Sequence, residues 1–244
     1  MSEIMEADYI VRNLLMNNLN IKLVAIDLDR TLLDTSVARH PFMAAKDVAK
    51  YHVKAMFRIL VPIILDSRLE CCIVTYTWQT KLIRNILSAA FPHHDTSRIR
   101  IEGPKQPLPG LYLIGEKLYG KEKYLETILS LIKAEKNLHI KNDEIFLFDD
   151  SQKNIDAAIK NNHYYYKVTD QSSVQDLRKH VEHFIRQKEN VYKPEKDIVQ
   201  PYLINKVAID NSVIQTNNVP HPQTIFIQPN ILIFHSLSQD NTLF

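Results

Sequence analysis

The stretch Lys22-Leu-Val-Ala-Ile-Asp27-Leu-Asp29-Arg-Thr31 decides the fold. Its first part is a short aliphatic run, which is typical of a strand buried on both faces of a parallel sheet. Two carboxylates, Asp27 and Asp29, follow directly, with a turn starting between them. Because ligands of open parallel sheets bind at the carboxyl ends of the strands, this stretch predicts a central strand and one edge of a site.

Further strands and helices alternate along the chain around this stretch. Residues 43–62 are predicted as one helix that Pro62 ends or kinks. This alternation favours an α/β fold, a Rossmann-like parallel sheet flanked by helices. The other predicted strands are 71–75, 98–101, 144–149 and 163–168, and the other predicted helices are 1–20, 79–90, 121–134, 154–161 and 172–189.

The composition changes near residue 193. Residues 1–193 carry the alternating pattern and are predicted to form one domain. Residues 194–244 hold five of the eleven prolines and few charges, yet they are too apolar for a typical disordered tail. We expect a C-terminal extension that packs on the domain, forms a small β appendage or binds a partner. The oligomeric state is left open.

Composition and charge narrow the class of protein. Hydrophobic residues make up 45% and charged residues 24%, as in globular proteins, and a net charge of +2 favours no polyanionic partner. The N-terminus lacks the pattern of a signal peptide, and the apolar runs are too short to span a membrane. The two cysteines, Cys71 and Cys72, are adjacent and favour a reducing compartment. The expected location is cytoplasmic; the alternative is an exported bacterial effector acting in a host cell.

The first carboxylate pair suits phosphate chemistry. Asp27 could attack phosphorus and form an acyl phosphate, and Asp29 could protonate the leaving oxygen and then activate water. The alternative is that Asp29 and Thr31 form an ordinary turn.

Two later positions suit a phosphoryl group. Thr75 ends a predicted strand, where its hydroxyl and nearby backbone N–H groups can bind an oxyanion, or where it simply closes a turn. Lys121 begins a helix, a place where the partial positive charge of the helix disfavours a lysine unless an anion lies between. Lys117 and Lys123 compete for this role.

A second acidic pair follows another strand. Adjacent carboxylates at Asp149 and Asp150 repel each other, and a divalent cation would neutralise them. Mg²⁺ prefers such oxygen ligands. Capping of the next helix by Asp150 or Ser151 is compatible with that role.

In this order, D-x-D-x-T at 27–31, Thr75, Lys121 and Asp149-Asp150 resemble the haloacid dehalogenase-like superfamily of aspartate-based phosphatases, over residues 20–170. The resemblance implies that Asp27 is the nucleophile, that Asp29 is the general acid and base, and that Thr75 and Lys121 bind phosphate. It further implies that Mg²⁺ is held by the carboxylates of Asp27 and Asp150 and by the backbone carbonyl of Asp29. Response-regulator receivers carry similar residues in another order and are excluded.

The remaining motif positions are given supporting roles by the resemblance. Thr31 and Asn154 support the site, and Asp149 binds metal through water or orients Lys121. Arg30 departs from the family pattern and points either toward an anionic substrate or to solvent. After the second motif, Trp78 lines the rim of the site or packs on the sheet.

The spacing of the motifs predicts no large cap domain. Both gaps between motifs are about 45 residues, which a crossover helix, a strand and their loops nearly fill. The sequence is similar to capless magnesium-dependent phosphatases that accept phosphotyrosine. This resemblance implies a phosphomonoester hydrolase acting on a macromolecule such as a phosphoprotein. Alternatives are a nucleic-acid end or small-metabolite phosphatase, a phosphotransferase, or a catalytically silent binding protein.

Overall fold

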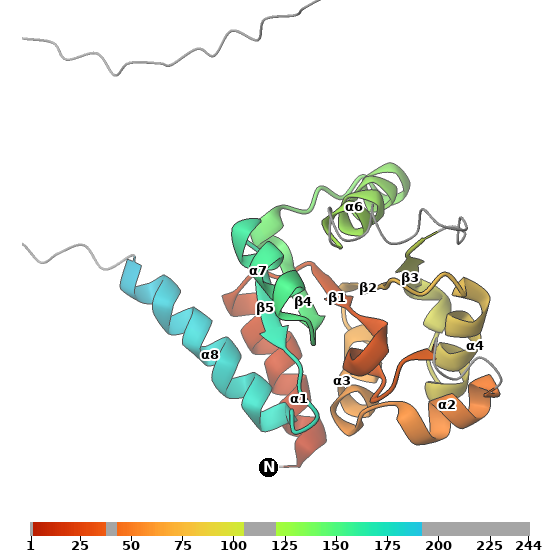
Figure 1. Cartoon of the computed structure of the whole chain (residues 1–244). Coiled ribbons are helices and arrows are strands. Elements are labelled where there is room, and N and C mark those ends of the chain that lie inside the picture. The colour runs from red at the N-terminus through yellow and green to blue at the C-terminus, as the bar shows by residue number, and fades with distance from the viewer. Residues whose placement is uncertain (1, 38–42, 105–120, 192–244) are drawn as a thin grey trace, which may run out of the picture. The chain divides into compact units, whose positions relative to one another are not determined.

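The computed structural model describes residues 2–37, 43–104 and 121–191. Within them, five parallel strands form one sheet in the order β3-β2-β1-β4-β5 (Figure 1). The strands are β1 (Leu23–Ile26), β2 (Glu70–Val74), β3 (Ile99–Glu102), β4 (Ile145–Asp149) and β5 (Tyr164–Lys167). The α/β fold with a Rossmann-like parallel sheet is therefore confirmed.

Helices cover both faces of this sheet. One face packs against α1 (Glu3–Tyr9), η1 (Ile10–Asn18), α3 (Ala55–Leu65), α4 (Thr80–Ala90) and α8 (Val174–Val191). The other packs against α6 (Glu122–Lys136) and α7 (Gln152–Lys160). Short turns complete the chain: η2 (Leu28–Leu32), η4 (Thr96–Arg98) and η5 (Asn142–Glu144).

The covering on both faces explains the apolar runs of the sequence. Every residue of β1, β2 and β4 is buried, so these strands have no polar face. Side chains alternate across the sheet: Val24 and Ile26 join the core on one face, and Leu23 and Ala25 join the core on the other.

The strand order reverses between β1 and β4. From β1 the chain builds outward through β2 to β3, and it then crosses to the other side for β4 and β5. Ile26 of β1 is in register with Phe148 of β4, so the two strands end side by side. Such a reversal is where open α/β sheets bind their ligands.

The prediction of one helix over 43–62 is wrong. The chain forms α2 (Ala45–His52) and then α3, with Pro62 inside α3 rather than at its end. The break lies at Val53, which pairs with Leu33, and at Lys54, whose N–H donates to the Leu32 carbonyl. These contacts hold the chain extended between the helices. Tertiary hydrogen bonds thus decide the break, not the proline.

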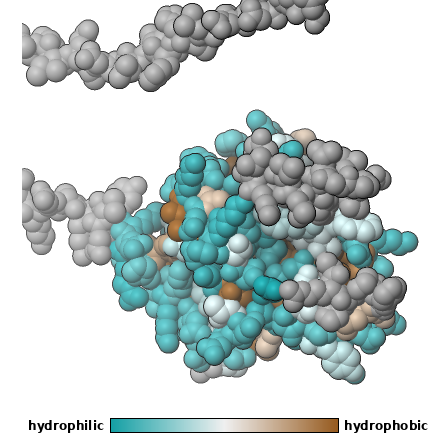
Figure 2. Space-filling model, viewed as in Figure 1, coloured by the Kyte–Doolittle hydropathy of each residue, from teal (hydrophilic) through white to brown (hydrophobic). Residues whose placement is uncertain are grey.

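No cap domain is present within the described ranges: α2, which packs against α4, is the one helix beyond the crossover α3 between β1 and β2. Residues 105–120 and 192–244 lie outside these ranges, and with them the predicted extension 194–244. In the described part of the chain, no helix has the length and apolar character needed to cross a membrane. The face shown in Figure 2 is mostly hydrophilic, with small separate apolar patches.

Candidate active site

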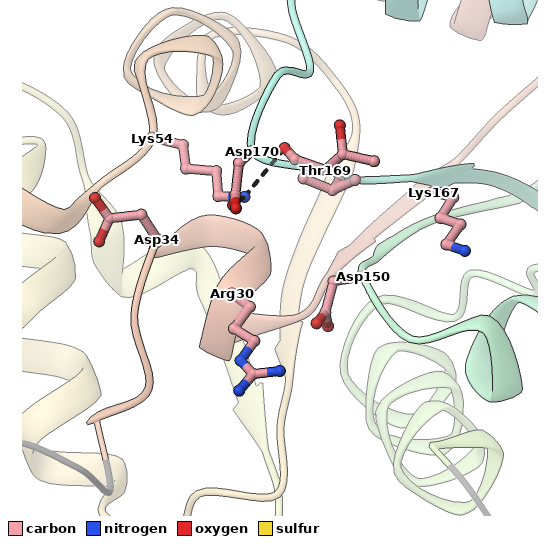
Figure 3. Close-up of a pocket in the computed structure, with 8 residues that line it drawn as sticks. Arg30, Asp34, Lys54, Asp150, Lys167, Thr169 and Asp170 are labelled. Atoms are coloured by element: carbon pink, nitrogen blue, oxygen red, sulfur yellow. Dashed lines mark hydrogen bonds and ion pairs between the residues drawn. The ribbon is translucent and has the colours of Figure 1, made fainter.

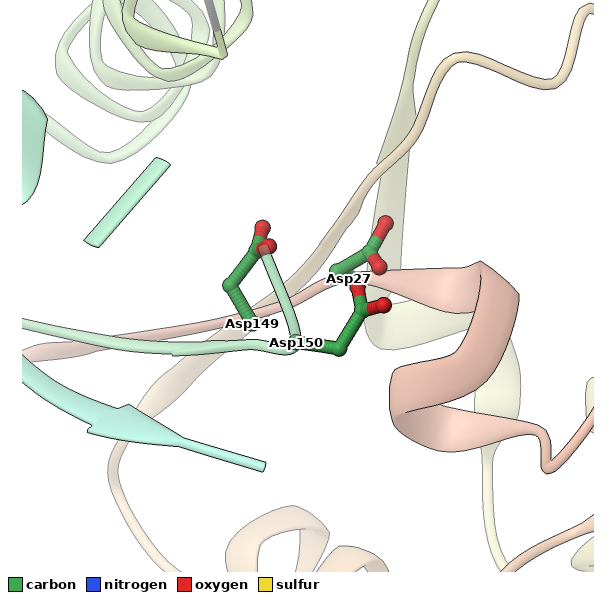
Figure 4. Close-up of side chains that lie close together, drawn as sticks. All are labelled: Asp27, Asp149 and Asp150. Carbon is green, nitrogen blue, oxygen red and sulfur yellow. The ribbon is translucent and has the colours of Figure 1, made fainter. Parts of the chain in front are cut away.

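Three carboxylates meet where β1 and β4 end. Asp27 follows β1, its N–H donates to the Phe148 carbonyl at 2.9 Å, and Asp149 and Asp150 end β4 and follow it. One oxygen from each carboxylate lies within 4.8 Å of the others (Figure 4). The structure thus brings together three of the predicted site residues at the reversal of the strand order.

Lys121 joins these carboxylates from the start of α6. Its side chain is 3% exposed, and its Nζ contacts Asp27 and lies 2.7 Å from Asp149 Oδ2. The ring of Tyr76 covers the same ammonium at 5.4 Å. Lys123 is exposed and lies away from the cluster, and Lys117 lies outside the described residues. Of the competing lysines that the structure describes, Lys121 is the one at the site.

Asp149 is fully occupied by hydrogen bonds. Its Oδ1 accepts from the Ser151 N–H at 2.8 Å, and Asn154 Nδ2 donates to both of its oxygens at 3.0 Å. With Lys121 on Oδ2, each oxygen already has two donors. This geometry suits a residue that orients Lys121. Asp150, by contrast, accepts from the residues that the structure describes only a long contact of 3.5 Å, from the Thr31 hydroxyl.

Burial makes the charges of this cluster strongly interdependent. Removal from water raises the pKa of Asp27 to about 7; Lys121 opposes the rise, and Asp149 and Asp150 add to it. For Lys121, burial works against the ammonium, but the carboxylates of Asp27 and Asp149 outweigh it and raise the pKa of Lys121. The lysine therefore stays charged.

The donor set fits a magnesium ion. Three carboxylates and one ammonium leave a net charge of −2 when all are ionised, which a divalent cation would neutralise. All available ligand atoms are oxygens, the type that Mg²⁺ prefers. Opposite ligands of Mg²⁺ lie roughly 4 Å apart, so the observed spacing needs only a small adjustment. Lys121 contacts Oδ1 of Asp27, so the other oxygen of Asp27 and the Asp150 carboxylate are the groups that could bind such an ion.

Asp29 is held apart from the three-carboxylate cluster. Its Oδ1 accepts from the Val37 N–H and its Oδ2 from the Thr77 hydroxyl, both at 2.7 Å. The turn η2 that carries it is closed by a hydrogen bond from the Leu32 N–H to the Asp27 carbonyl. Asp29 therefore keeps a fixed position one short turn beyond Asp27.

Thr75 follows β2 and is fully buried. Its Oγ1 accepts from the Thr77 N–H at 3.0 Å, which is the turn role foreseen for it. The hydroxyl proton remains available for an oxyanion. Gly103 permits this packing, because a Cβ there would lie 2.7 Å from the Thr75 carbonyl oxygen.

Other predicted features are placed as follows. Trp78 is 48% exposed, so about half of its side chain faces solvent. Cys71 and Cys72 are buried and unbridged, and burial raises the pKa of Cys71 to about 12, which makes that thiol a poor nucleophile.

Some contacts at the site could not be assigned from the sequence. Thr77 and the Val37 amide hold Asp29, and Tyr76 covers Lys121 and donates to Asn154 Oδ1 at 3.4 Å. The only signal for these residues was the T-x-T spacing after a strand, which places two hydroxyls near one strand end without naming their partners.

Comparisons with known proteins do not show the family of this chain. No protein-family model matches the sequence, and no curated protein matches it significantly. A solved structure described as "a predicted HAD-like family hydrolase from Porphyromonas gingivalis" is similar at 10% identity, over 72% of this chain and 99% of that chain, with a TM-score of 0.37. So low a TM-score shows neither a shared family nor a shared activity.

Proposed function

We propose that this chain is a magnesium-dependent phosphomonoester hydrolase of the haloacid dehalogenase-like superfamily that works through an aspartyl phosphate on Asp27. The observation that carries the proposal is the contact of buried Asp27 with Lys121 beside two further carboxylates. A buried nucleophile, a fixed cation and hard oxygen ligands at a reversal of strand order are the parts that phosphoryl transfer needs.

Before the reaction, one cation and one hydroxyl of the site hold the phosphoryl group of the substrate. The ammonium of Lys121 and the hydroxyl of Thr75 bind the phosphoryl oxygens and offset their charge. Mg²⁺ would be bound by the carboxylates of Asp27 and Asp150 and by the backbone carbonyl of Asp29, and it supplies further positive charge there. Asp149 positions Lys121 through the 2.7 Å ion pair.

The reaction has two steps. In the first, a carboxylate oxygen of Asp27 forms a bond to phosphorus as the bond to the leaving oxygen breaks, and Asp29 gives that oxygen a proton. In the second, Asp29 takes a proton from water while the water oxygen attacks phosphorus. The bond to Asp27 then breaks, inorganic phosphate leaves, and Asp29 is again protonated. Its contacts with Thr77 and the Val37 amide keep Asp29 in place for both transfers.

The proposed substrate is a phosphoprotein, with phosphotyrosine favoured. The exposed ring of Trp78 supports this choice, because it lies three residues beyond Thr75 and offers a flat surface for an aromatic ring. The lack of a cap among the described residues supports it too, since an open site admits a large substrate.

A substrate panel tests the reaction class. The wild-type protein is assayed with MgCl₂ or with EDTA on p-nitrophenyl phosphate, a phosphotyrosine peptide, a 5′-phosphorylated oligonucleotide and a sugar phosphate. We expect magnesium-dependent release of inorganic phosphate, fastest from the peptide. Transfer of phosphate to an added alcohol would instead identify a phosphotransferase. Absence of turnover on all four would contradict the proposal and favour a binding protein.

A further inference from the structure

A hollow opens beside the proposed reaction centre. It has a volume of about 370 Å³, and its polar lining includes three cations and three carboxylates (Figure 3). These are Arg30, Lys54, Lys167, Asp34, Asp150 and Asp170. Asp150 belongs to both the hollow and the three-carboxylate cluster. A molecule bound at Asp27 would therefore lie next to this hollow.

Half of the charges of the hollow are already paired. Lys54 donates to Asp170 and to the Thr169 carbonyl, both at 3.1 Å. Asp34 lies 2.8 Å from His52 Nδ1. These pairs leave Arg30, Lys167 and Asp150 to determine the charge that the hollow presents.

The two remaining cations lack anionic partners. Lys167 donates to a neutral acceptor, Gln152 Oε1, at 2.8 Å. The guanidinium of Arg30 makes no hydrogen bond or ion pair with any residue that the structure describes. Since Asp150 is a proposed metal ligand, a bound Mg²⁺ would neutralise its charge. The hollow is then left with two cations free to bind an anion.

The backbone of Arg30 makes this side chain unusual. Its φ of 65° lies in the left-handed region, where a residue with a Cβ is disfavoured by about 1 kcal/mol and glycine is not. The Arg30 N–H donates to the Thr35 carbonyl at 3.1 Å, which holds the turn in this form. An arginine therefore occupies a position where a glycine would fold more easily, and its guanidinium is exposed beside the site.

We infer that Arg30, with Lys167, forms a subsite for a second anionic group on the substrate. The inference rests on the proposed function and sharpens it: the preferred phosphopeptide carries a carboxylate or a second phosphoryl group next to its phosphotyrosine. A guanidinium binds either oxyanion through charge-assisted hydrogen bonds. Arg30 is thus a specificity-determining residue.

A set of three phosphotyrosine peptides tests this subsite. Three phosphotyrosine peptides differ only at the residues flanking the phosphotyrosine, which are glutamate, glutamine or phosphoserine. We expect kcat/KM about 10-fold higher for the glutamate or phosphoserine peptide than for the glutamine peptide, the effect of one charge-assisted hydrogen bond. In Arg30→Gly this preference falls to near unity. Comparing glutamate with phosphoserine distinguishes a carboxylate from a phosphoryl group.

The choice of variants separates the subsite from folding. Glycine suits the φ of Arg30, so Arg30→Gly is expected to fold at least as well as the wild type. Lys167→Met is the second variant and should reduce the same preference. Arg68→Gln is the control. Arg68 is exposed in the turn before β2, at the amino ends of the strands and so away from the site. The preference for acidic peptides should not change in this variant.

Binding separates failure of the subsite from failure of the proposed function. The affinities of the full-length wild type and of Arg30→Gly for non-hydrolysable phosphonate analogues of the same peptides are measured with MgCl₂ by fluorescence anisotropy, which needs no turnover. A preference for the acidic peptides that Arg30→Gly abolishes supports the subsite even if no peptide is hydrolysed. Equal affinity for acidic and neutral peptides, or a preference that survives Arg30→Gly, overturns it.

Discussion

The two ends of α6 carry the same kinds of ion pair in opposite surroundings. At the N-terminal end, Lys121 is 3% exposed and contacts Asp27 and Asp149. At the C-terminal end, Arg100 donates to both oxygens of Glu135, at 3.1 and 2.7 Å, and the Glu135 side chain is 54% exposed. Lys136, at the same end, pairs with Glu70. The helix thus has one ionic end that is buried, and another, called here the solvated end, where its own charged residues Glu135 and Lys136 are about half exposed.

The difference shows what each set of charges is for. Exposed pairs gain little, because water screens their attraction and the side chains lose freedom. Buried charges lose their hydration, and a well-packed apolar cluster in their place is often as stable or more so. The charges around Lys121 are therefore poorly explained by stability and well explained by chemistry. The pairs of Glu135 and Lys136 need no function beyond solubility and modest anchoring.

The largest difference between the two ends is expected in activity. Lys121→Met removes the cation that faces the phosphoryl group and should lower kcat at least ~100-fold on p-nitrophenyl phosphate. Lys136→Met makes the same change at the solvated end and should leave kcat within about 2-fold. Equal losses in the two variants would contradict the distinction between the ends.

The next effect is on stability and depends on pH. Because the pKa of Asp27 is raised to about 7, the metal-free protein should lose stability as pH rises from about 4 through about 7, where this carboxyl loses its proton. Magnesium binds the ionised form, so saturating MgCl₂ should stabilise the protein by about 2–3 kcal/mol near pH 8 and much less near pH 5.5.

Thermal unfolding followed by differential scanning fluorimetry measures this effect. Asp27→Asn serves as the reference, since it cannot titrate and should gain little from magnesium. A magnesium shift that is as large in Asp27→Asn, or larger at the acidic pH, would show that the ion does not bind at Asp27.

A smaller effect comes from a second buried pair at the N-terminal end of α6. His163 Nε2 lies 2.9 Å from Glu122 Oε2, and its Nδ1 lies 2.8 Å from the Asn142 carbonyl. Both partners accept hydrogen bonds, so the ring needs two protons. Burial opposes this charge, but Glu122 and the Asn142 carbonyl outweigh burial and raise the pKa of His163.

A raised histidine pKa gives stability that is complete below the ordinary pKa and is lost as pH rises through the folded value. We therefore expect His163→Gln to cost about 1 kcal/mol near pH 6 and less near pH 9, measured by urea unfolding. Glu135→Gln, at the solvated end, should leave the urea midpoint unchanged at both pH values. A loss of stability in His163→Gln that grows as the pH rises would contradict the assignment of a positive charge to the His163 ring.

The sheet could be predicted because its strands are buried on both faces. Such strands leave apolar runs, as in Leu23–Ile26 and Ile145–Asp149, and local sequence is enough to recognise them. The cluster of Asp27, Asp149 and Asp150 could also be predicted from the sequence. Once the buried strands are recognised, a carboxylate that ends a parallel strand is expected at the end of the sheet where ligands bind.

Features that depend on contacts between distant segments could not be predicted from the sequence. The break at Val53 depends on its pairing with Leu33, and no local signal competes with Pro62. The partners of Asp29 come from two separate segments, Val37 and Thr77. The left-handed backbone conformation of Arg30 could not be predicted either, since a glycine is the usual sequence sign of a positive φ.

The most direct test of the account is the rate at which Asp27→Asn hydrolyses p-nitrophenyl phosphate with MgCl₂. Asn keeps the size of the side chain but cannot act as the nucleophile, so we predict a loss of about 1,000-fold or more. Asp143→Asn, an exposed change just before β4, is the control and should retain wild-type activity. Turnover by Asp27→Asn that stays magnesium-dependent and near the wild-type rate would contradict a covalent role for Asp27.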